Sequence, residues 1–255
     1  MWHRFGDLRS PEVGKIMQTK PLVILPLGQT EEHGPHLPVS TDSVIASRLA
    51  QAIAKKLGER LAVILMETIV YGYSGKAMER WPGTIRVGID TVRDYGYEIC
   101  SSLVDMGANK IAIINGHGHH RGLMEVMARK LSDSKGVSPL ILDPAGLASE
   151  ALKQNARGGA GGSCHGGEFE TSLMLFLEPH LVDMSKAADN PLEDTGKFPP
   201  GTFWSTWDRQ KTEEGIYGKP TVASAETGKI FFDAAVTKAI ECLEEYYRRG
   251  SALTE

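Results

Sequence analysis

The 255-residue sequence lacks the features that mark secreted and membrane-spanning proteins. Its three cysteines, Cys100, Cys164 and Cys242, are odd in number and widely scattered, which does not form a disulfide framework and fits a reducing cytoplasm. Residues 1–17 contain no apolar core of signal-peptide length, and no apolar run approaches the roughly 18 residues of a membrane span. We therefore expect a cytoplasmic protein with no membrane partner.

The sequence also lacks an excess of positive charge and the common nucleotide-binding motifs. Lysine and arginine total 28 against 32 aspartate and glutamate residues, a formal net charge of -4, so no nucleic-acid partner is indicated. There is no P-loop, no strand followed by G-x-G-x-x-G, and no G-x-S-x-G elbow of a serine hydrolase. These absences favour a small-molecule substrate and argue against nucleotide binding and a serine nucleophile.

Short apolar runs alternate with longer amphipathic stretches along the chain. The runs predict strands at 21–28, 60–72, 110–116 and 138–146, and the amphipathic stretches predict helices at 43–58, 87–108, 120–133, 167–180 and 225–250. Strands separated by helices of this length imply parallel pairing with right-handed crossovers. We expect a single α/β domain over residues 1–255, with three layers and a mostly parallel central sheet.

Most histidines lie in three clusters, each of which follows a predicted strand or precedes a predicted helix. Six of the eight belong to these clusters: His33 and His36, then His117, His119 and His120, then His165. Ligands of open α/β sheets bind beyond the carboxyl ends of the strands. We therefore expect the three clusters to converge at one rim of the sheet.

The first cluster lies in the segment GQTEEHGPHLPVSTD, residues 28–42, and contains Glu31, Glu32, His33, His36 and Asp42. Imidazole nitrogens mixed with carboxylate oxygens suit zinc, manganese or iron(II). In an extended loop Glu31 and His33 point to the same side and reach two neighbouring ions, which Asp42 can bridge with both oxygens. The alternative for Asp42 is that it caps the following helix.

The second and third clusters carry the sequences NGHGHH and SCHGGEFETSLML. The first of these places His117 at the carboxyl tip of a strand, although a turn with surface histidines is the alternative. In the other, Glu168 is expected in the first turn of a helix, where the helix dipole favours a carboxylate. Cys164 precedes His165 directly, so a nucleophilic thiol is an alternative to a packing role there.

Together, the segments GQTEEHGPHLPVSTD, NGHGHH and CHGGEFETSLML resemble the creatininase (creatinine amidohydrolase) family. The sequences WPGT and GKPTVASAETG also look like it, so the resemblance spans nearly the whole chain. It implies an α/β fold, two divalent metal ions per chain (usually Zn²⁺ or Mn²⁺) bridged by an aspartate and a water, and a homo-oligomer that is often a hexamer.

The resemblance also implies residue roles. The residues that match metal ligands are Glu31, His33, Asp42, His117 and Glu170, with Asp42 as the bridge. His165 looks like the catalytic histidine that moves protons near the scissile bond, and Glu170 like a glutamate of the same catalytic centre. Glu32 and His36 would orient the ligands from behind.

The chain departs from creatininases after the NGH segment. Creatininases carry a glutamate ligand two residues after that histidine, and this chain has His119 and His120 there. Either His119 replaces the glutamate, or Glu170 ligates and both histidines face the substrate. We therefore expect a substrate other than creatinine.

Trp204 and Trp207 lie in an irregular stretch at 187–220, expected to be an ordered loop or lid, where they would close over a planar substrate. Packing in the core or at an interface is the alternative for both indoles.

The chemistry predicted from these features is hydrolysis by a metal-bridging hydroxide that opens a C–N bond of a small cyclic amide or amide-like compound. One alternative is hydrolysis of a C–C bond in a cyclic polyol ketone of the keto-inositol type. A deformylase, a peptidase and a metal-binding protein without catalytic activity are further alternatives.

Overall fold

A parallel five-stranded sheet forms the centre of the molecule. The computed structural model describes residues 1–159, 161–191 and 212–249. The strands are β1 (Trp2–Arg4), β2 (Leu22–Leu27), β3 (Val63–Leu65), β4 (Lys110–Asn115) and β5 (Leu140–Leu142). Their order is β1-β3-β2-β4-β5, and each adjacent pair is parallel. The predicted α/β class with a mostly parallel sheet is confirmed.

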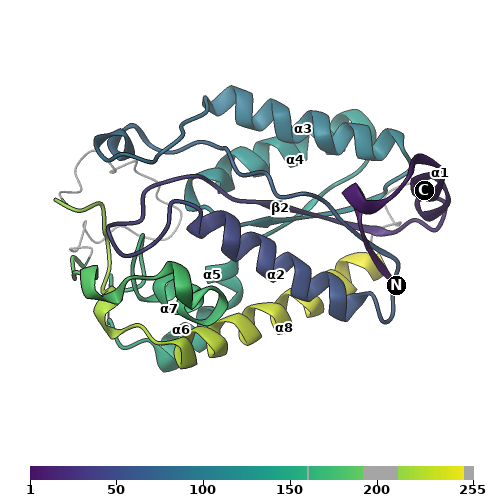
Figure 1. The fold of residues 1–255 in the computed structure, drawn as a ribbon. Coiled ribbons are helices and arrows are strands. Elements are labelled where there is room, and N and C mark those ends of the chain that lie inside the picture. Colours follow the sequence, from purple (N-terminus) through teal and green to yellow (C-terminus); the bar gives the residue numbers. More distant parts are fainter. Residues whose placement is uncertain (160, 192–211, 250–255) are drawn as a thin grey trace.

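Helices cover both faces of this sheet (Figure 1). One core cluster packs the sheet against α2 (Thr41–Leu57), α7 (Glu168–Leu177) and α8 (Ala225–Arg249). The other packs it against α1 (Ser10–Met17), α3 (Ile89–Asp105) and α4 (Arg121–Lys135). These helices and the sheet form the predicted three layers.

Burial of the central strands on both faces explains why the segments predicted as strands are continuously apolar and do not alternate with polar residues. Leu22 and Ile24 of β2 belong to one core cluster, whereas Val23 and Leu25 belong to the other. Successive side chains of a strand point to opposite faces. Because both faces are covered by helices, every position of β2 is buried.

The remaining elements are short. They are the helices α5 (Pro144–Leu147) and α6 (Ser149–Asn155), and the 3-10 helices η1 (Phe5–Asp7), η2 (Lys76–Arg80), η3 (Gly118–His120), η4 (Pro179–Leu181), η5 (Met184–Lys186) and η6 (Pro220–Val222). The strand predicted over 60–72 is confined to β3, and the sequence did not predict β1, α1, α5 or α6. Elements of three to eight residues present too few periods for a clear hydrophobic pattern.

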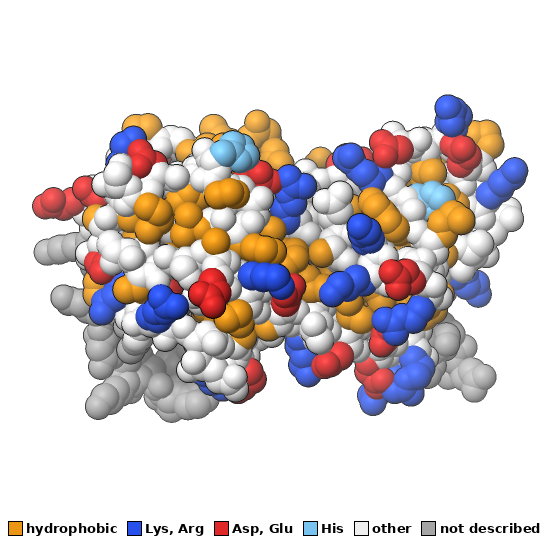
Figure 2. Space-filling view, turned by 60° about the horizontal axis from the view of Figure 1, so that its bottom comes forward, with side chains coloured by type: hydrophobic (Ala, Val, Ile, Leu, Met, Phe, Trp, Pro, Cys, Tyr) orange, Lys and Arg blue, Asp and Glu red, His pale blue; other side chains and the backbone are white. Residues whose placement is uncertain are grey.

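The outer face of the layer that contains α8 has a mixed surface. Figure 2 shows hydrophobic side chains there among lysines, arginines and carboxylates. Within the described ranges, no helix is both long enough and apolar enough to cross a membrane.

The helices α7 and α8 pack closely where Gly228 meets the backbone of α7. A Cβ atom at Gly228 would overlap the carbonyl oxygen of Ser172. The same contact includes the rings of Phe169 and Phe231, whose centroids lie 5.7 Å apart. This contact holds α7, which carries Glu170, against the core.

We expect Gly228→Ala to lower the free energy of unfolding by about 1–3 kcal/mol, since the added methyl group would overpack the contact. Gly14→Ala is the matched control, because a Cβ there meets nothing within 4 Å. It should raise stability by about 0.5–1 kcal/mol, as alanine is the better helix former. Urea unfolding measures both, and equal effects of the two substitutions would contradict the packing argument.

Candidate metal centre

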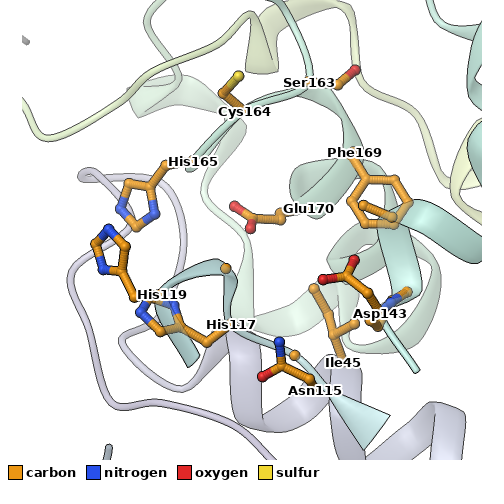
Figure 3. Close-up of a pocket in the computed structure, with 14 residues that line it drawn as sticks. Ile45, Asn115, His117, His119, Asp143, Ser163, Cys164, His165, Phe169 and Glu170 are labelled. Carbon is orange, nitrogen blue, oxygen red and sulfur yellow. The ribbon is translucent and has the colours of Figure 1, made fainter. Parts of the chain in front are cut away.

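The structure brings side chains from all three histidine clusters together at the carboxyl end of the sheet. Glu31 and His33 lie in the loop after β2, and Asp42 lies in the first turn of α2. His117 directly follows the Asn-Gly pair at the end of β4, and Glu170 lies in the first turn of α7. Figure 3 shows His117, His119, His165 and Glu170 around one cavity. Parallel pairing of β2 with β4 brings the first two of these segments to the same edge.

Asp42 lies between two histidines. Its Oδ1 is 3.1 Å from His33 Nε2, and its Oδ2 is 2.8 Å from His117 Nδ1. The helix α2 begins at Thr41 after the N-cap Ser40, and no side chain caps it. The carboxylate of Asp42 therefore faces the cluster rather than capping the helix.

Glu31 is a buried carboxylate that lacks hydrogen-bond partners. Its side chain is 1% exposed, and neither oxygen accepts a hydrogen bond. Its Oε2 lies 3.4 Å from His117 Nδ1 and 3.7 Å from His165 Nδ1. A charge buried without a partner costs several kcal/mol, of the order of 3–5 kcal/mol, unless a cation compensates it. The residues present therefore fit a bound cation.

The ring of His33 is oriented by its own loop. Its Nδ1 lies 3.0 Å from the Glu31 carbonyl oxygen, which only accepts, so Nδ1 carries the hydrogen. In the neutral ring, the lone pair is then on Nε2, which lies 3.1 Å from Asp42 Oδ1 and 3.7 Å from Glu170 Oε2. A lone pair and two carboxylates converge only where a cation or a proton lies between them. A ligating histidine has this arrangement, with its other N–H donated to a carbonyl.

The donor atoms have the separations that ligands of shared ions require. Ligands about 2.0–2.2 Å from an ion in tetrahedral or octahedral geometry lie about 3.0–3.5 Å from one another. The nitrogen–oxygen distances above span 2.8 to 3.7 Å. Three overlapping sets have their donor atoms within 4.8 Å: Glu31 with His33 and His165, Glu31 with His117 and His119, and His33 with Asp42 and Glu170. These sets overlap at Glu31 and His33, so the cluster can hold a metal ion.

His165 has a lone pair directed toward the cluster. Its Nε2 lies 2.7 Å from the Glu32 carbonyl oxygen and must donate to it. In the neutral ring Nδ1 therefore accepts, and it lies 3.7 Å from Glu31 Oε2. The ring centroids of His33 and His165 are 4.3 Å apart, so this acceptor is next to a predicted ligand.

The glutamates of the third cluster have different environments. Glu170 Oε2 accepts from the Gly166 N–H at 2.7 Å while facing His33. Glu168 accepts from the backbone N–H groups of Arg157 and Gly158 and is fully buried. Glu168 therefore lies in the first turn of α7, as predicted, and its hydrogen bonds hold the preceding loop.

His119 and His120 accept hydrogen bonds from the backbone. His119 Nδ1 accepts from the Gly75 N–H at 3.1 Å, and His120 Nε2 accepts from the Tyr73 N–H at 2.9 Å. Burial and the nearby His117 lower the pKa of each ring to about 3, so both are neutral. The neutral His119 ring then carries its hydrogen on Nε2, which makes that nitrogen a donor. His119 lines the cavity, whereas His120 is fully buried behind it.

Glu32 and His36 link the first loop to the rest of the site. Glu32 Oε2 accepts from the Gly34 N–H at 3.0 Å, and His36 Nε2 lies 2.9 Å from Thr171 Oγ1. Burial, aided by the nearby His33, lowers the pKa of His36 to about 4, so the ring is neutral. These contacts hold the loop from behind. Trp204 and Trp207 lie outside the described residues.

Three polar residues of the site were missed by sequence reasoning. Gln29 is buried and holds the opposite loop, since its Oε1 accepts from the Gly72 N–H at 2.6 Å. Asn115 and Asp143 line the cavity at the ends of β4 and β5. Their position at strand ends was the available signal, but aspartate and asparagine are also common in turns.

Comparison with known proteins places these features in a wider group. The creatininase family model, described as creatinine amidohydrolase, matches residues 6–243. The mycofactocin precursor peptide peptidase of Mycobacterium ulcerans is 29% identical over 240 residues, which cover 92% of this chain and 89% of that protein. The creatinine amidohydrolase of Pseudomonas putida is 27% identical over 244 residues, covering 89% of this chain and 90% of that protein.

A solved structure supports the fold. A structure described as "Creatininase Mn" superposes with a TM-score of 0.81 at 24% identity, covering 96% of this chain and 98% of that chain. At this identity the similarity establishes a shared fold.

We expect Asp42→Asn to remove bound metal, because the substitution deletes the charge that faces both His33 and His117. Elemental analysis of purified wild-type protein should find close to two ions per chain, and the variant should lose most of them. Glu168→Gln is the control: it should lower the melting temperature while keeping the metal. Full metal content in Asp42→Asn would contradict the bridging assignment.

The metal-free protein should lose stability as the pH rises from about 6.5 to 9. Burial lowers the pKa of His117, but the carboxylates of Glu31 and Asp42 outweigh it and raise the pKa to about 9. A pKa that is higher in the folded state than in the unfolded state stabilises the fold. This stabilisation is fully present below about pH 6.5, the pKa of the unfolded state, and is lost as the pH rises through about 9, the pKa in the folded state. Metal binding requires the neutral ring, so metal affinity should increase over the same range.

Thermal unfolding of chelator-treated and metal-loaded protein across this pH range tests that sign. His117→Gln should flatten the pH dependence of the chelated protein. A chelated wild-type protein that gained stability with rising pH would contradict it.

Proposed function

The chain belongs to the creatininase family of metal-dependent amidohydrolases, and we propose that it uses two divalent ions to hydrolyse the C–N bond of a small cyclic amide or amide-like substrate. The observation that carries the proposal is the position of Asp42, whose two oxygens face His33 and His117 separately. The proposed ligands are Glu31, His33, Asp42, His117 and Glu170. Mixed nitrogen and oxygen donors suit Zn²⁺ or Mn²⁺, and also Fe²⁺.

Glu170 rather than His119 completes the proposed ligand set. His119 Nδ1 already accepts from the Gly75 N–H, which leaves an N–H at Nε2 instead of a lone pair. Glu170 has a carboxylate oxygen 3.7 Å from His33 Nε2. His119 then donates a hydrogen bond to the substrate from one side of the cavity.

When bound, two such ions supply a water whose pKa is lowered toward about 7 and polarise the scissile carbonyl. The protein contributes proton transfer through His165. Because its Nε2–H is held by the Glu32 carbonyl, Nδ1 is the atom that accepts a proton and passes it to the leaving nitrogen. Tyr217 N–H donates to the His165 carbonyl at 2.7 Å and fixes the backbone of this residue.

Cleavage of a C–C bond in a cyclic polyol ketone is the second candidate. The 3-dehydro-scyllo-inosose hydrolase of Thermotoga maritima is 26% identical over 267 residues, covering 96% of this chain and 81% of that protein. The same residues would serve attack on a ketone, and the His119 donor would bind a hydroxyl group. Peptide hydrolysis is a third candidate, supported by the similarity to the mycofactocin precursor peptide peptidase.

The family resemblance also predicts a homo-oligomer, with a hexamer as the expected form. Exposed aromatic side chains support this, since Tyr71 is 56% exposed and Tyr95 is 54% exposed, and both line the same surface hollow. Light scattering of the purified protein measures the assembly size.

The substrate class is tested by hydrolysis assays with added Zn²⁺ or Mn²⁺. Lactams, formamides, short peptides and keto-inositols form the panel. Turnover of lactams above the other classes supports the proposal, whereas turnover of keto-inositols alone would favour C–C cleavage.

We expect His165→Ala to keep its metal and to lose about 10²–10⁴-fold in kcat, the range for loss of a general acid–base group. His180→Ala is the matched control, since His180 is an exposed histidine on η4 and should leave kcat unchanged. Metal content is measured on the same samples. Full activity of His165→Ala would show that another group moves the proton.

A further inference from the structure

Two polar side chains that the proposed mechanism does not use line the cavity beside the metal centre. They are Asn115 at the end of β4 and Asp143 directly after β5. Figure 3 shows both side chains at the cavity, across from His119 and His165. The cavity has a volume of about 170 Å³.

The side-chain amide of Asn115 is buried and makes no hydrogen bond within the protein. The residue is 1% exposed, and neither Nδ2 nor Oδ1 has a hydrogen-bond partner. A buried polar group left unpaired costs about 1–3 kcal/mol. Asn115 lines the cavity, so its amide is placed where a bound molecule can supply the missing partners. The amide offers that molecule two donor hydrogens and an acceptor oxygen.

Asp143 is the neighbour of Asn115 across the sheet. The parallel register pairs Ile114 with Leu142, so Asn115 and Asp143 occupy the next positions along the two strands. Residues in register on adjacent parallel strands lie on the same side of the sheet. Asp143 Oδ1 accepts from the Gly146 N–H at 3.3 Å as the N-cap of α5. The carboxylate has capacity for further donors, since its two oxygens offer about four acceptor sites.

Asp143 gives this wall a carboxylate that the proposed metal ions do not use. Apart from the proposed ligands His117 and Glu170, the other ionisable side chains of the lining are His119, Cys164 and His165, and no lysine or arginine is among the described residues that line the cavity. A carboxylate or phosphate placed here would meet like charge. A group with several N–H donors would instead pair with Asp143 and with the Asn115 oxygen.

We propose that Asn115 and Asp143 form a specificity-determining subsite for a substrate group rich in N–H donors, such as an amidine, a ureide or an ammonium group, and that the subsite discriminates against carboxylates. The inference rests on the proposed function, since it assigns a chemical class to the substrate of that site. The cavity is smaller than the roughly 300–1,000 Å³ typical of drug-sized pockets. It therefore holds the part of the substrate next to the scissile bond.

Acetamidinium and acetate test the subsite because they have nearly the same shape and opposite charge. Each probe is titrated calorimetrically into the metal-loaded protein. Asp143→Asn removes the charge and retains the helix cap, because asparagine caps as well as aspartate. Asn115→Leu removes both hydrogen-bonding groups at similar volume. Asp133→Asn, an exposed substitution on α4, is the matched control.

We expect Asp143→Asn to weaken acetamidinium binding about tenfold or more, as for loss of a charged hydrogen bond, and to leave acetate binding unchanged or tighter. Asn115→Leu should weaken acetamidinium binding about fivefold. Thermal unfolding of each variant verifies that it is folded, and Asp133→Asn should bind both probes as the wild type does.

Three results would overturn the subsite: no binding of acetamidinium to the wild type, unchanged affinity in both cavity variants, or equal weakening of both probes. Failure of the proposed function gives a different result, in which no amide in the panel is hydrolysed while acetamidinium binding still depends on Asp143.

Discussion

The buried carboxylates at the carboxyl end of the sheet are the constraint on which the rest of the site depends. Glu31 is removed from solvent with no hydrogen-bond partner, and Asp42 lies between two imidazoles. Because these charges are buried, positively charged groups must compensate them: protonated imidazoles such as His117 in the metal-free protein, and the proposed metal ions when they bind. The loop after β2, the tip of β4 and the first turn of α7 are held so that their donor atoms meet around that charge. Packing of α7 on α8 at Gly228 contributes by supporting the segment that carries Glu170.

The backbone decides which nitrogen each histidine presents. The carbonyls of Glu31 and Glu32 accept from His33 and His165, and these rings direct lone pairs toward the cluster. The amide of Gly75 donates to Nδ1 of His119, which leaves the hydrogen of that ring on Nε2. The backbone therefore gives His33 and His165 lone pairs suited to a metal or a proton, and gives His119 the tautomer opposite to that of His33.

Most of the proposed metal ligands lie in other segments of the chain than Asn115 and Asp143, which line the cavity at the ends of β4 and β5. Relatives that share this fold or family include a named amidohydrolase, a peptide peptidase and an inosose hydrolase. The proposed ions would serve any of these reactions, so the walls of the cavity would select the substrate. In this chain His119 lines one side of the cavity, and Asn115 and Asp143 line it at the ends of the strands.

The sequence by itself determined the fold class and the family, because buried parallel strands read as continuous apolar runs and the histidine-containing segments match the family. It also predicted a set of metal ligands, since GQTEEHGPHLPVSTD combines carboxylates with imidazoles at close spacing. It left open whether Asp42 caps a helix and whether His119 or Glu170 is a ligand. Tertiary structure decided the orientation of Asp42 and the hydrogen position on His119, since both depend on partners distant in the chain, such as His117 and Gly75. It also placed Asn115 beside Asp143, because the register of two parallel strands is set by packing of the whole sheet.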